Sequence, residues 1–201
     1  MLLWRRERER GQDLSEFPEA YQGLSYVGRR TVLQQLAGYM VKQGRSTVDR
    51  EKTLKKFEQA LRGIKCGQPE KAGEVCQGMV ERSGMLREKH DGEFEFIHNT
   101  FKEFLAARQF VHVDDELKGL VEKSDDPEWD NILLFAAADP DDTAFGIDLI
   151  RRVLPRQAPA PAQKGRKKGT LLASGSYYRR LLIAVRMHAV MEGRDEKIDE
   201  R

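Results

Sequence analysis

The sequence predicts a mostly α-helical chain that contains one small β-hairpin. Most apolar residues recur at helical spacing, and only Met85 to Glu88 and Glu93 to His98 alternate as short strands do. These two stretches flank Asp91-Gly92, which is a strong signal for a hairpin turn. Helical segments come before the hairpin and after it. Three helices followed by a hairpin form the winged-helix pattern, so we expect a winged helix in the first half of the chain.

Composition limits the size of the core and the class of partner. Of the 201 residues, 39% are hydrophobic and 34% are charged, which allows one moderate core or two small ones. The 35 basic and 33 acidic residues give a net charge of +2, too balanced for a dedicated nucleic-acid or membrane-surface protein. No apolar run approaches the roughly 20 residues that a membrane span needs. We therefore expect protein or small-ligand partners.

The cysteines and the first residues indicate a cytoplasmic protein. Cys66 and Cys76 form no CxxC motif and have no histidine pair nearby, so neither a zinc site nor a disulfide framework is predicted. Reduced thiols are the expectation. The opening "MLLWRRERERG" places its charges after a very short apolar start, which excludes a signal peptide. It is typical of the end of an apolar helix whose beginning is missing.

Three amphipathic helices precede the hairpin. The first runs from Ser25 to Gln43, the second follows a cap at Thr47 or Asp49, and the third begins near Pro69 and stops at Gly84. Their predicted inner faces are Val27, Val32, Leu33, Leu36, Ala37 and Met40; Leu54, Phe57, Leu61 and Ile64; and Val75, Met79 and Val80.

The hairpin leads within about two residues into a fourth helix. Thr100 and Glu103 fit a capping box, and the packed stripe of this helix is predicted to be Phe101, Phe104, Leu105 and Ala106. By strand periodicity His98 shares one face with Phe94 and Phe96. His98 is then either a core histidine bonded to a backbone carbonyl, or a donor that projects into a cleft beside a neighbouring domain. Both interpretations place it out of bulk water.

Helices continue beyond Phe110. The segments "DDELKGLVEK", "PEWDNILLFAAA" and "DTAFGIDLIRRVL" each combine an apolar face with an acidic start, and suggest the beginning of a superhelical repeat region. Next, "PRQAPAPAQKGRKKG" predicts a flexible linker or surface loop. A last helix from Leu171 to Met191 follows, with a charged end that we expect to fray. Its predicted apolar residues are Leu172, Tyr178, Leu181, Leu182, Val185 and Val190.

The central motif resembles a known family. "GEFEFIHNTFKEFLAARQFV", with "MVERSGMLREK" and "YVGRRTVLQQLAGYMV" before it, is similar to the winged-helix part of NACHT-type STAND NTPases, which include bacterial antiphage NACHT proteins and NOD-like receptors. The resemblance covers roughly Leu2 to Leu154. The residues that fill the family pattern are Phe96, His98, Phe101, Glu103, Phe104, Leu105, Ala106 and Ala107.

The resemblance implies a division of the chain into consecutive parts. Residues 1–45 would be a helical adaptor segment that adjoins a missing NTPase core, and residues 46–112 the winged-helix domain. Residues 113–154 would form a helical region and residues 155–170 a linker rich in Pro, Ala and basic residues. Residues 171–201 would form the C-terminal helix with a frayed tail.

The resemblance also implies a function. The matching histidine of the family donates a hydrogen bond to a phosphate of ADP, so His98 would close the winged helix over nucleotide bound jointly with an upstream NACHT NTPase domain. Such a charge-assisted bond is worth about 1.5–3 kcal/mol and shifts a closed–open equilibrium by roughly tenfold to a hundredfold. The chain would then be a regulatory part of an ATP/ADP switch in innate immunity or antiviral defence, able to form homo-oligomers on activation.

The residues themselves predict no catalysis by this chain alone. The sequence has no G-x-x-x-x-G-K-[ST] loop and no apolar strand that ends in paired acids, and "QKGRKKGT" has the wrong spacing for a phosphate loop. Glu93, Glu95 and Glu103 flank His98, but no Ser or Cys nucleophile accompanies them. No catalytic residue and no metal ligand are therefore predicted, and solvated or packing roles suffice for His90, His112 and His188.

Two alternatives stay open. A stand-alone winged-helix module could bind proteins without any nucleotide function. DNA binding would place the helix Pro69 to Gly84 in the major groove. That helix carries Lys71 and Arg82 against three glutamates, so its face repels phosphate, and the basic loop Lys164 to Lys168 is predicted to be solvated. Protein interaction is the stronger of the two alternatives.

Overall fold

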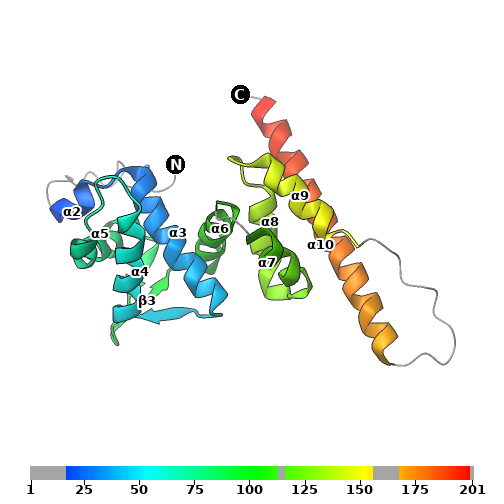
Figure 1. The fold of residues 1–201 in the computed structure, drawn as a ribbon, viewed down its shortest axis with the longest axis horizontal. Helices are drawn as coiled ribbons and strands as arrows, with labels where there is room; N and C mark the ends of the chain where they lie inside the picture. The colour runs from blue at the N-terminus through cyan, green and yellow to red at the C-terminus, as the bar shows by residue number, and fades with distance from the viewer. Residues whose placement is uncertain (1–16, 113–115, 156–167, 200–201) are drawn as a thin grey trace. The chain divides into compact units, whose positions relative to one another are not determined.

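The computed structural model describes residues 17–112, 116–155 and 168–199, and the side chains of α10 from residue 175 to 192. It forms two compact units, Met1–Gln109 and Phe110–Arg201, and each is described by itself (Figure 1). The chain is mostly helical with a small antiparallel sheet, as predicted. Among the described residues, every helix is too short or too polar to span a bilayer.

The helices of the first unit begin and end at the predicted signals. After the short α2, Glu19–Gln22, come α3, Tyr26–Lys42, and α4, Arg50–Arg62. The Ser25 hydroxyl caps α3 by accepting a hydrogen bond from Gly28 N at 3.1 Å, and the Asp49 carboxylate caps α4 by accepting one from Lys52 N at 2.8 Å. The third predicted helix is the 3-10 turn Pro69–Lys71 followed by α5, Ala72–Ser83, which ends at Gly84 in a left-handed conformation with φ of 59°.

A three-stranded antiparallel sheet completes the winged helix. Its strands are β1, Thr47–Asp49, β2, Leu86–Glu88, and β3, Glu93–Phe96, in the order β1-β3-β2. Val48 pairs with Phe94 and Leu86 pairs with Phe96. The strand β1 was not predicted, because three residues are too few to show alternation and two of them were read as possible helix caps.

The wing turns at the predicted residues. Gly92 has a φ of 75° and donates to Lys89 O at 3.0 Å, while Lys89 N donates to Glu93 O at 2.8 Å. The Asp91 carboxylate accepts a hydrogen bond from Glu93 N at 3.2 Å. A positive φ is favourable for glycine, so the Asp91-Gly92 pair fixes the hairpin.

The core of the first unit uses most of the predicted apolar faces. Val32, Leu33, Leu36 and Met40 of α3 are fully buried, but Val27, which was predicted to face inward, is 57% exposed. It lies in the first turn of α3, where the neighbouring Gly28 and Arg29 are the buried residues. Further buried side chains that the helical spacing did not predict include Tyr21, Leu24 and Val48.

The helix α6, Asn99–Val111, begins two residues earlier than a cap at Thr100 predicts. Thr100 therefore lies inside the first turn and cannot act as the cap of a capping box, so that prediction is wrong. Glu103 instead accepts a hydrogen bond from the Asn99 side chain at 2.5 Å. Leu105 and Ala106 are buried as predicted, whereas Phe101 is half-buried and Phe104 is 38% exposed.

The second unit contains the three predicted helices. They are α7, Glu116–Glu122, α8, Asp130–Ala137, and α9, Thr143–Val153, with the 3-10 turns Lys123–Asp125 and Pro127–Trp129 between α7 and α8. Asp142 caps α9 by accepting from Phe145 N at 2.9 Å. Trp129 stacks on Phe110 with ring centroids 5.8 Å apart.

The last helix, α10, covers Lys168–Asp199 and packs against α8 and α9. It begins before the predicted Leu171, and the segment predicted to fray stays helical to Asp199. Residues 156–167 of the predicted linker lie outside the described residues, as do residues 1–16 and the side chain of Leu172.

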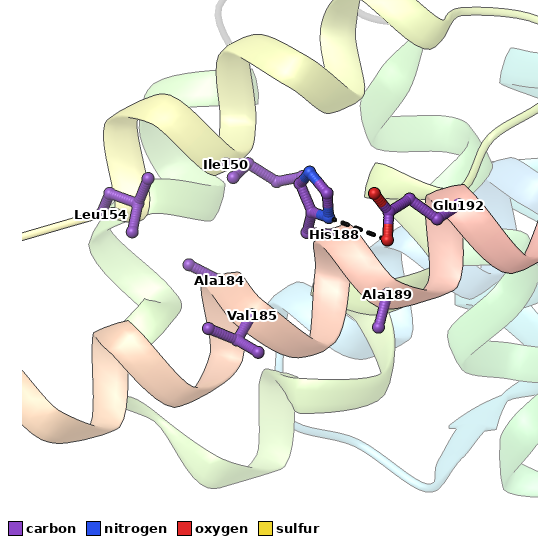
Figure 2. A pocket seen from close by; sticks show the side chains of 7 residues that line it. All are labelled: Ile150, Leu154, Ala184, Val185, His188, Ala189 and Glu192. Carbon is purple, nitrogen blue, oxygen red and sulfur yellow. Dashed lines mark ion pairs between the residues drawn. The ribbon is translucent and has the colours of Figure 1, made fainter.

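The residues predicted to form the packed apolar side of α10 lie on its outer, exposed side, so this prediction is wrong. Tyr178, Leu182 and Val185 are 63%, 61% and 57% exposed, and Leu181 and Val190 are exposed as well. The buried residues are Ile183, Ala184 and Met187 on the opposite side. An open groove of about 320 Å³ runs between α9 and the outer side of α10 (Figure 2). Its walls are Ile150, Leu154, Ala184, Val185, His188, Ala189 and Glu192.

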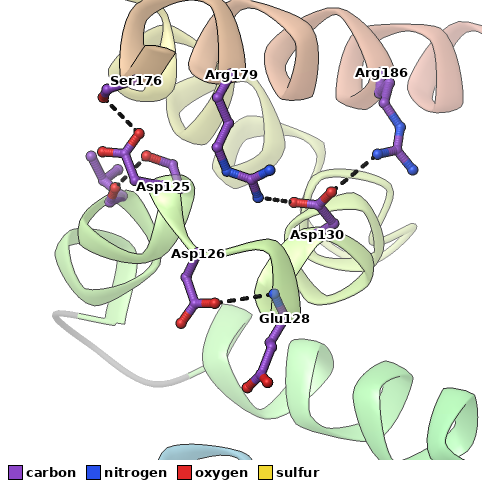
Figure 3. Close-up of polar contacts among 9 residues, drawn as sticks. Asp125, Asp126, Glu128, Asp130, Ser176, Arg179 and Arg186 are labelled. Carbon is purple, nitrogen blue, oxygen red and sulfur yellow. Dashed lines mark hydrogen bonds and ion pairs between the residues drawn. The ribbon is translucent and has the colours of Figure 1, made fainter. Parts of the chain in front are cut away.

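Ion pairs explain why the other side of α10 faces inward. Asp130 at the start of α8 pairs with Arg179 at 2.5 Å and with Arg186 at 3.2 Å (Figure 3). Asp125 pairs with Arg180 at 2.7 Å and accepts from the Ser176 hydroxyl at 2.7 Å. Ser176 and Arg180 lie on the same side of α10 as Ile183 and Met187, and Arg179 and Arg186 lie on the flank beside it. The helix α10 has apolar residues on two sides, and the ion pairs of its arginines with Asp125 and Asp130 favour the orientation in which Ile183 and Met187 face inward.

Candidate functional site

His98 lies at the junction between the sheet and α6. Ile97 N donates to Met85 O at 2.8 Å and so makes the last backbone contact to β2. The chain then bends, and His98 O accepts from Phe101 N at 3.1 Å and from Lys102 N at 3.4 Å. These are the first hydrogen bonds of α6, so His98 occupies the cap position of that helix.

The side chain of His98 is exposed to solvent. Phe94 and Phe96 are buried, as the strand periodicity predicted, but the expectation that His98 is buried with them is wrong. The physical reason is that β3 ends at Phe96 and the bend at Ile97 and His98 releases the next side chains from strand alternation. A core role for His98 is thereby excluded in this chain.

The surroundings of His98 combine apolar and polar groups. Its ring meets the edge of Phe101 with centroids 5.4 Å apart. Ile97 and Phe104 are 39% and 38% exposed. Glu103, which is buried, accepts from the Asn99 amide, so its carboxylate is withdrawn from the surface. The corner that remains presents an imidazole against the Phe101 ring and next to the exposed Ile97 in the chain, and the exposed Phe104 lies further along α6.

This corner suits an anionic ligand group. The first amides of α6 precede its hydrogen-bond ladder, and they carry the positive end of the helix dipole. An imidazole N–H at the same end adds a side-chain donor. Helix starts of this kind bind phosphate and carboxylate oxygens. His98 and the start of α6 therefore fit one phosphate group, whereas the base and sugar of a nucleotide would need residues from elsewhere.

The cysteines offer no nucleophile near this corner. Cys76 of α5 is buried, and burial raises the pKa of its thiol to about 12. A thiol with so high a pKa stays protonated at neutral pH and is unreactive. Glu95, one of the acids near His98, is paired with Arg87 and Lys89 across the hairpin.

The exposed face of α5 is more acidic than its sequence suggests. Glu74 and Glu81 are exposed, and so is Glu70 just before the helix. Arg82, which the sequence counted against them, is buried with its guanidinium carbon 4.4 Å from the centre of the Phe17 ring. A negative helix face repels the DNA backbone, which argues against the major-groove alternative.

One side-chain grouping in the second unit was missed by sequence reasoning. His112, Asp139 and Asp141 bring ligand atoms within 4.8 Å of one another, a spacing that a metal ion could share. Asp139 accepts from Asp141 N at 2.8 Å, so the turn between α8 and α9 already accounts for the approach of the two carboxylates. A solvated or a packing role was expected for His112, and its side chain is exposed. No spacing rule links residues so far apart in the sequence.

Comparison with known families agrees with this architecture. Residues 2–110 match the sequence profile of a family described as a winged helix-turn-helix domain C-terminal to NACHT. The match spans more than half of the 201 residues and includes the sheet, α5 and the start of α6 with His98. No curated protein matches the chain.

Proposed function

The chain belongs to the family of winged helix-turn-helix domains C-terminal to NACHT, and we propose that it closes over ADP held by a NACHT NTPase core. In this proposal it is a non-catalytic regulatory part that stabilises the inactive state. The observation that carries the proposal is the exposed imidazole of His98 at the start of α6, within the matched residues.

The interaction with phosphate would come from His98 and the first turn of α6. The imidazole donates to a phosphate oxygen, and the dipole of the 13-residue helix α6 adds to the attraction. A charge-assisted hydrogen bond is worth about 1.5–3 kcal/mol. Its loss when the nucleotide site changes state shifts the closed–open equilibrium by roughly tenfold to a hundredfold. Phe101 supports the imidazole through its ring edge, 5.4 Å between centroids.

The partner surface would include the apolar residues beside His98. Ile97 and Phe104 stay exposed in this chain, and a NACHT core seated over His98 would cover them. Opening would release both the phosphate contact and this apolar contact, and so pass the nucleotide state to other parts of the protein. Signalling in innate or antiviral defence, in the cytoplasm and through homo-oligomers, completes the proposal.

The experiment compares His98→Ala with His90→Ala in the complete protein that carries the NACHT core. Both histidines are exposed, but His90 lies in the wing turn, away from the start of α6. His98→Ala is expected to weaken ADP affinity by roughly tenfold to a hundredfold and to raise basal activation, while His90→Ala leaves both unchanged. Unchanged ADP affinity and basal activity in His98→Ala would refute the proposal.

A second function rests on the same corner without nucleotide. The exposed Ile97 and Phe104 would suit a protein-interaction module as well. In that case Ile97→Ser would weaken partner binding while His98→Ala would not change it. Measuring both variants against the same partner separates the two functions.

A further inference from the structure

The outer side of α10 carries a regular apolar seam that its own unit leaves uncovered. Gly175, Tyr178, Leu182, Val185 and Ala189 are all exposed and follow one another at intervals of three and four residues. This is the spacing of the a and d positions of a coiled coil. An added side chain at Gly175 would meet nothing within 4 Å, so the N-terminal end of the seam is open.

We propose that a second copy of this chain docks antiparallel on this seam and inserts its Tyr178 into the groove between α9 and α10. The proposal goes beyond the nucleotide-dependent function, because it involves neither His98 nor a NACHT core. A twofold axis between Leu182 and Val185 would make the contact isologous, with the same residues on both copies.

Side-chain sizes along the seam fit such an axis. In the antiparallel register Tyr178 faces Ala189 of the other copy, and Leu182 faces Val185 of the other copy. Each layer then joins a larger residue to a smaller one, which is the arrangement that lets facing side chains interdigitate. A parallel register would instead place Tyr178 against Tyr178 and Ala189 against Ala189. The sequence of the seam therefore favours the antiparallel pair.

The groove offers a complementary site for the Tyr178 ring. Ala189 borders it, together with Ile150, Leu154 and Val185, which provide an apolar wall (Figure 2). His188 and Glu192 line the same groove, with His188 Nδ1 3.5 Å from a Glu192 carboxylate oxygen. A buried tyrosine needs a partner for its hydroxyl group. The groove supplies both the apolar wall and the polar partner.

The charges beside the seam are compatible with a second copy. Arg179 and Arg186 border it on one side, and both pair with Asp130 of the same chain, at 2.5 Å and 3.2 Å. The shared Asp130 carboxylate offsets one of these two positive charges, which reduces the repulsion between two copies. The other border carries Leu181 and His188. This nearly neutral strip does not attract a strongly charged partner such as nucleic acid.

The contact area determines how strongly two copies are expected to bind. One helix pair with two inserted rings buries less than the roughly 800 Å² per partner of a stable complex. The dimer should accordingly form in a concentration-dependent manner. Sedimentation equilibrium of the 201-residue chain, from micromolar to millimolar concentration, is expected to show monomer and dimer in exchange.

Paired substitutions test the seam and its register. Val185→Ser is expected to weaken dimerisation about tenfold or more, whereas Val190→Ser, the same change on an exposed valine of the same helix but off the seam, leaves it unchanged. Tyr178→Ala and Ala189→Tyr should each weaken the dimer. The double variant, which restores one large and one small residue per layer, should recover it. Thermal unfolding of each variant checks that α10 stays folded.

Several outcomes would overturn the proposal. If the chain is monomeric at every concentration, the seam does not bind a second copy and is left to another segment or another protein. A dimer that Val185→Ser and Val190→Ser affect equally does not use this seam. Single variants that weaken the dimer without recovery in the double variant contradict the antiparallel register.

Discussion

The two units hold their helices by different forces. In the first unit, Leu105 and Ala106 of α6 are buried in an apolar core. Just before this helix, Ile97 N donates a backbone hydrogen bond to Met85 O at the edge of the sheet. In the second unit, α10 is oriented by Asp125 and Asp130 through ion pairs with partly exposed arginines. Apolar burial involves no charge that salt could screen or acid could titrate, whereas exposed ion pairs are weakened by both. The second unit should therefore respond to solution conditions more strongly than the first.

The largest expected effect is the loss of a core side chain from the first unit. Leu105 is 3% exposed, so Leu105→Ala should lower the free energy of unfolding by about 2–5 kcal/mol through the cavity it leaves. Phe104→Ala on the exposed side of α6 should cost far less. The alkylation rate of Cys76, whose buried thiol has a pKa raised to about 12, reports opening of this unit. Equal rates in both variants would show that Leu105 is not a core residue.

The next effect concerns the close approach of α8 and α9. A side chain at Gly146 would lie 2.2 Å from the Ala137 carbonyl oxygen, so Gly146→Ala should destabilise the second unit by about 1–3 kcal/mol through overpacking. Gly73→Ala in α5 is the matched control, since nothing lies within 4 Å there. It should stabilise the first unit by about 0.4–1 kcal/mol. Thermal unfolding should show a lower midpoint for Gly146→Ala and a higher midpoint for Gly73→Ala. A Gly146→Ala protein as stable as the wild type would contradict the close contact.

Acid should loosen α10 before it affects the first unit. The hydrogen bond from Arg180 is the main cause that lowers the pKa of Asp125 below its ordinary value, and Ser176 adds to it. Asp125 therefore contributes to the stability of the folded chain at pH values above the pKa of an unfolded aspartate, about 3.9. This contribution is lost as the pH falls through the lower pKa that Asp125 has in the folded chain. The protection of the α10 amides against hydrogen exchange, measured relative to their intrinsic exchange rates at each pH, should therefore fall below about pH 4.

Asp125→Asn isolates this contribution. It should raise the exchange of α10 at neutral pH by a small amount, since an exposed ion pair is worth about 0–1 kcal/mol. It should also remove part of the acid response. An unaltered acid response in Asp125→Asn would assign the pH dependence to other carboxylates.

Local signals in the sequence predicted most of the fold. The helices α3, α4 and α9 are capped by Ser25, Asp49 and Asp142. The sequence predicted the start of each helix, with Thr47 and Asp49 as the two alternatives for α4. The wing turn followed from Asp91-Gly92 in the same way. These features depend on a few neighbouring residues, which explains why the sequence was sufficient for them.

Features that depend on distant residues were missed. The inward side of α10 could not be predicted, because the helix is apolar on both sides and the choice depends on Asp125 and Asp130, some 50 residues earlier. The exposure of His98 depends on where β3 stops pairing, and strand periodicity does not fix that end. The family match, by contrast, covers the motif that the sequence had already singled out.

The most direct test of the proposed switch is the rate at which ADP leaves the complete protein. Release of a fluorescent ADP analogue is to be compared for wild type, His98→Ala and His98→Gln, in which the glutamine amide keeps an N–H donor. Release is expected to be roughly tenfold to a hundredfold faster in His98→Ala, with partial recovery in His98→Gln. Identical release rates in all three proteins would contradict a contact between His98 and the phosphate.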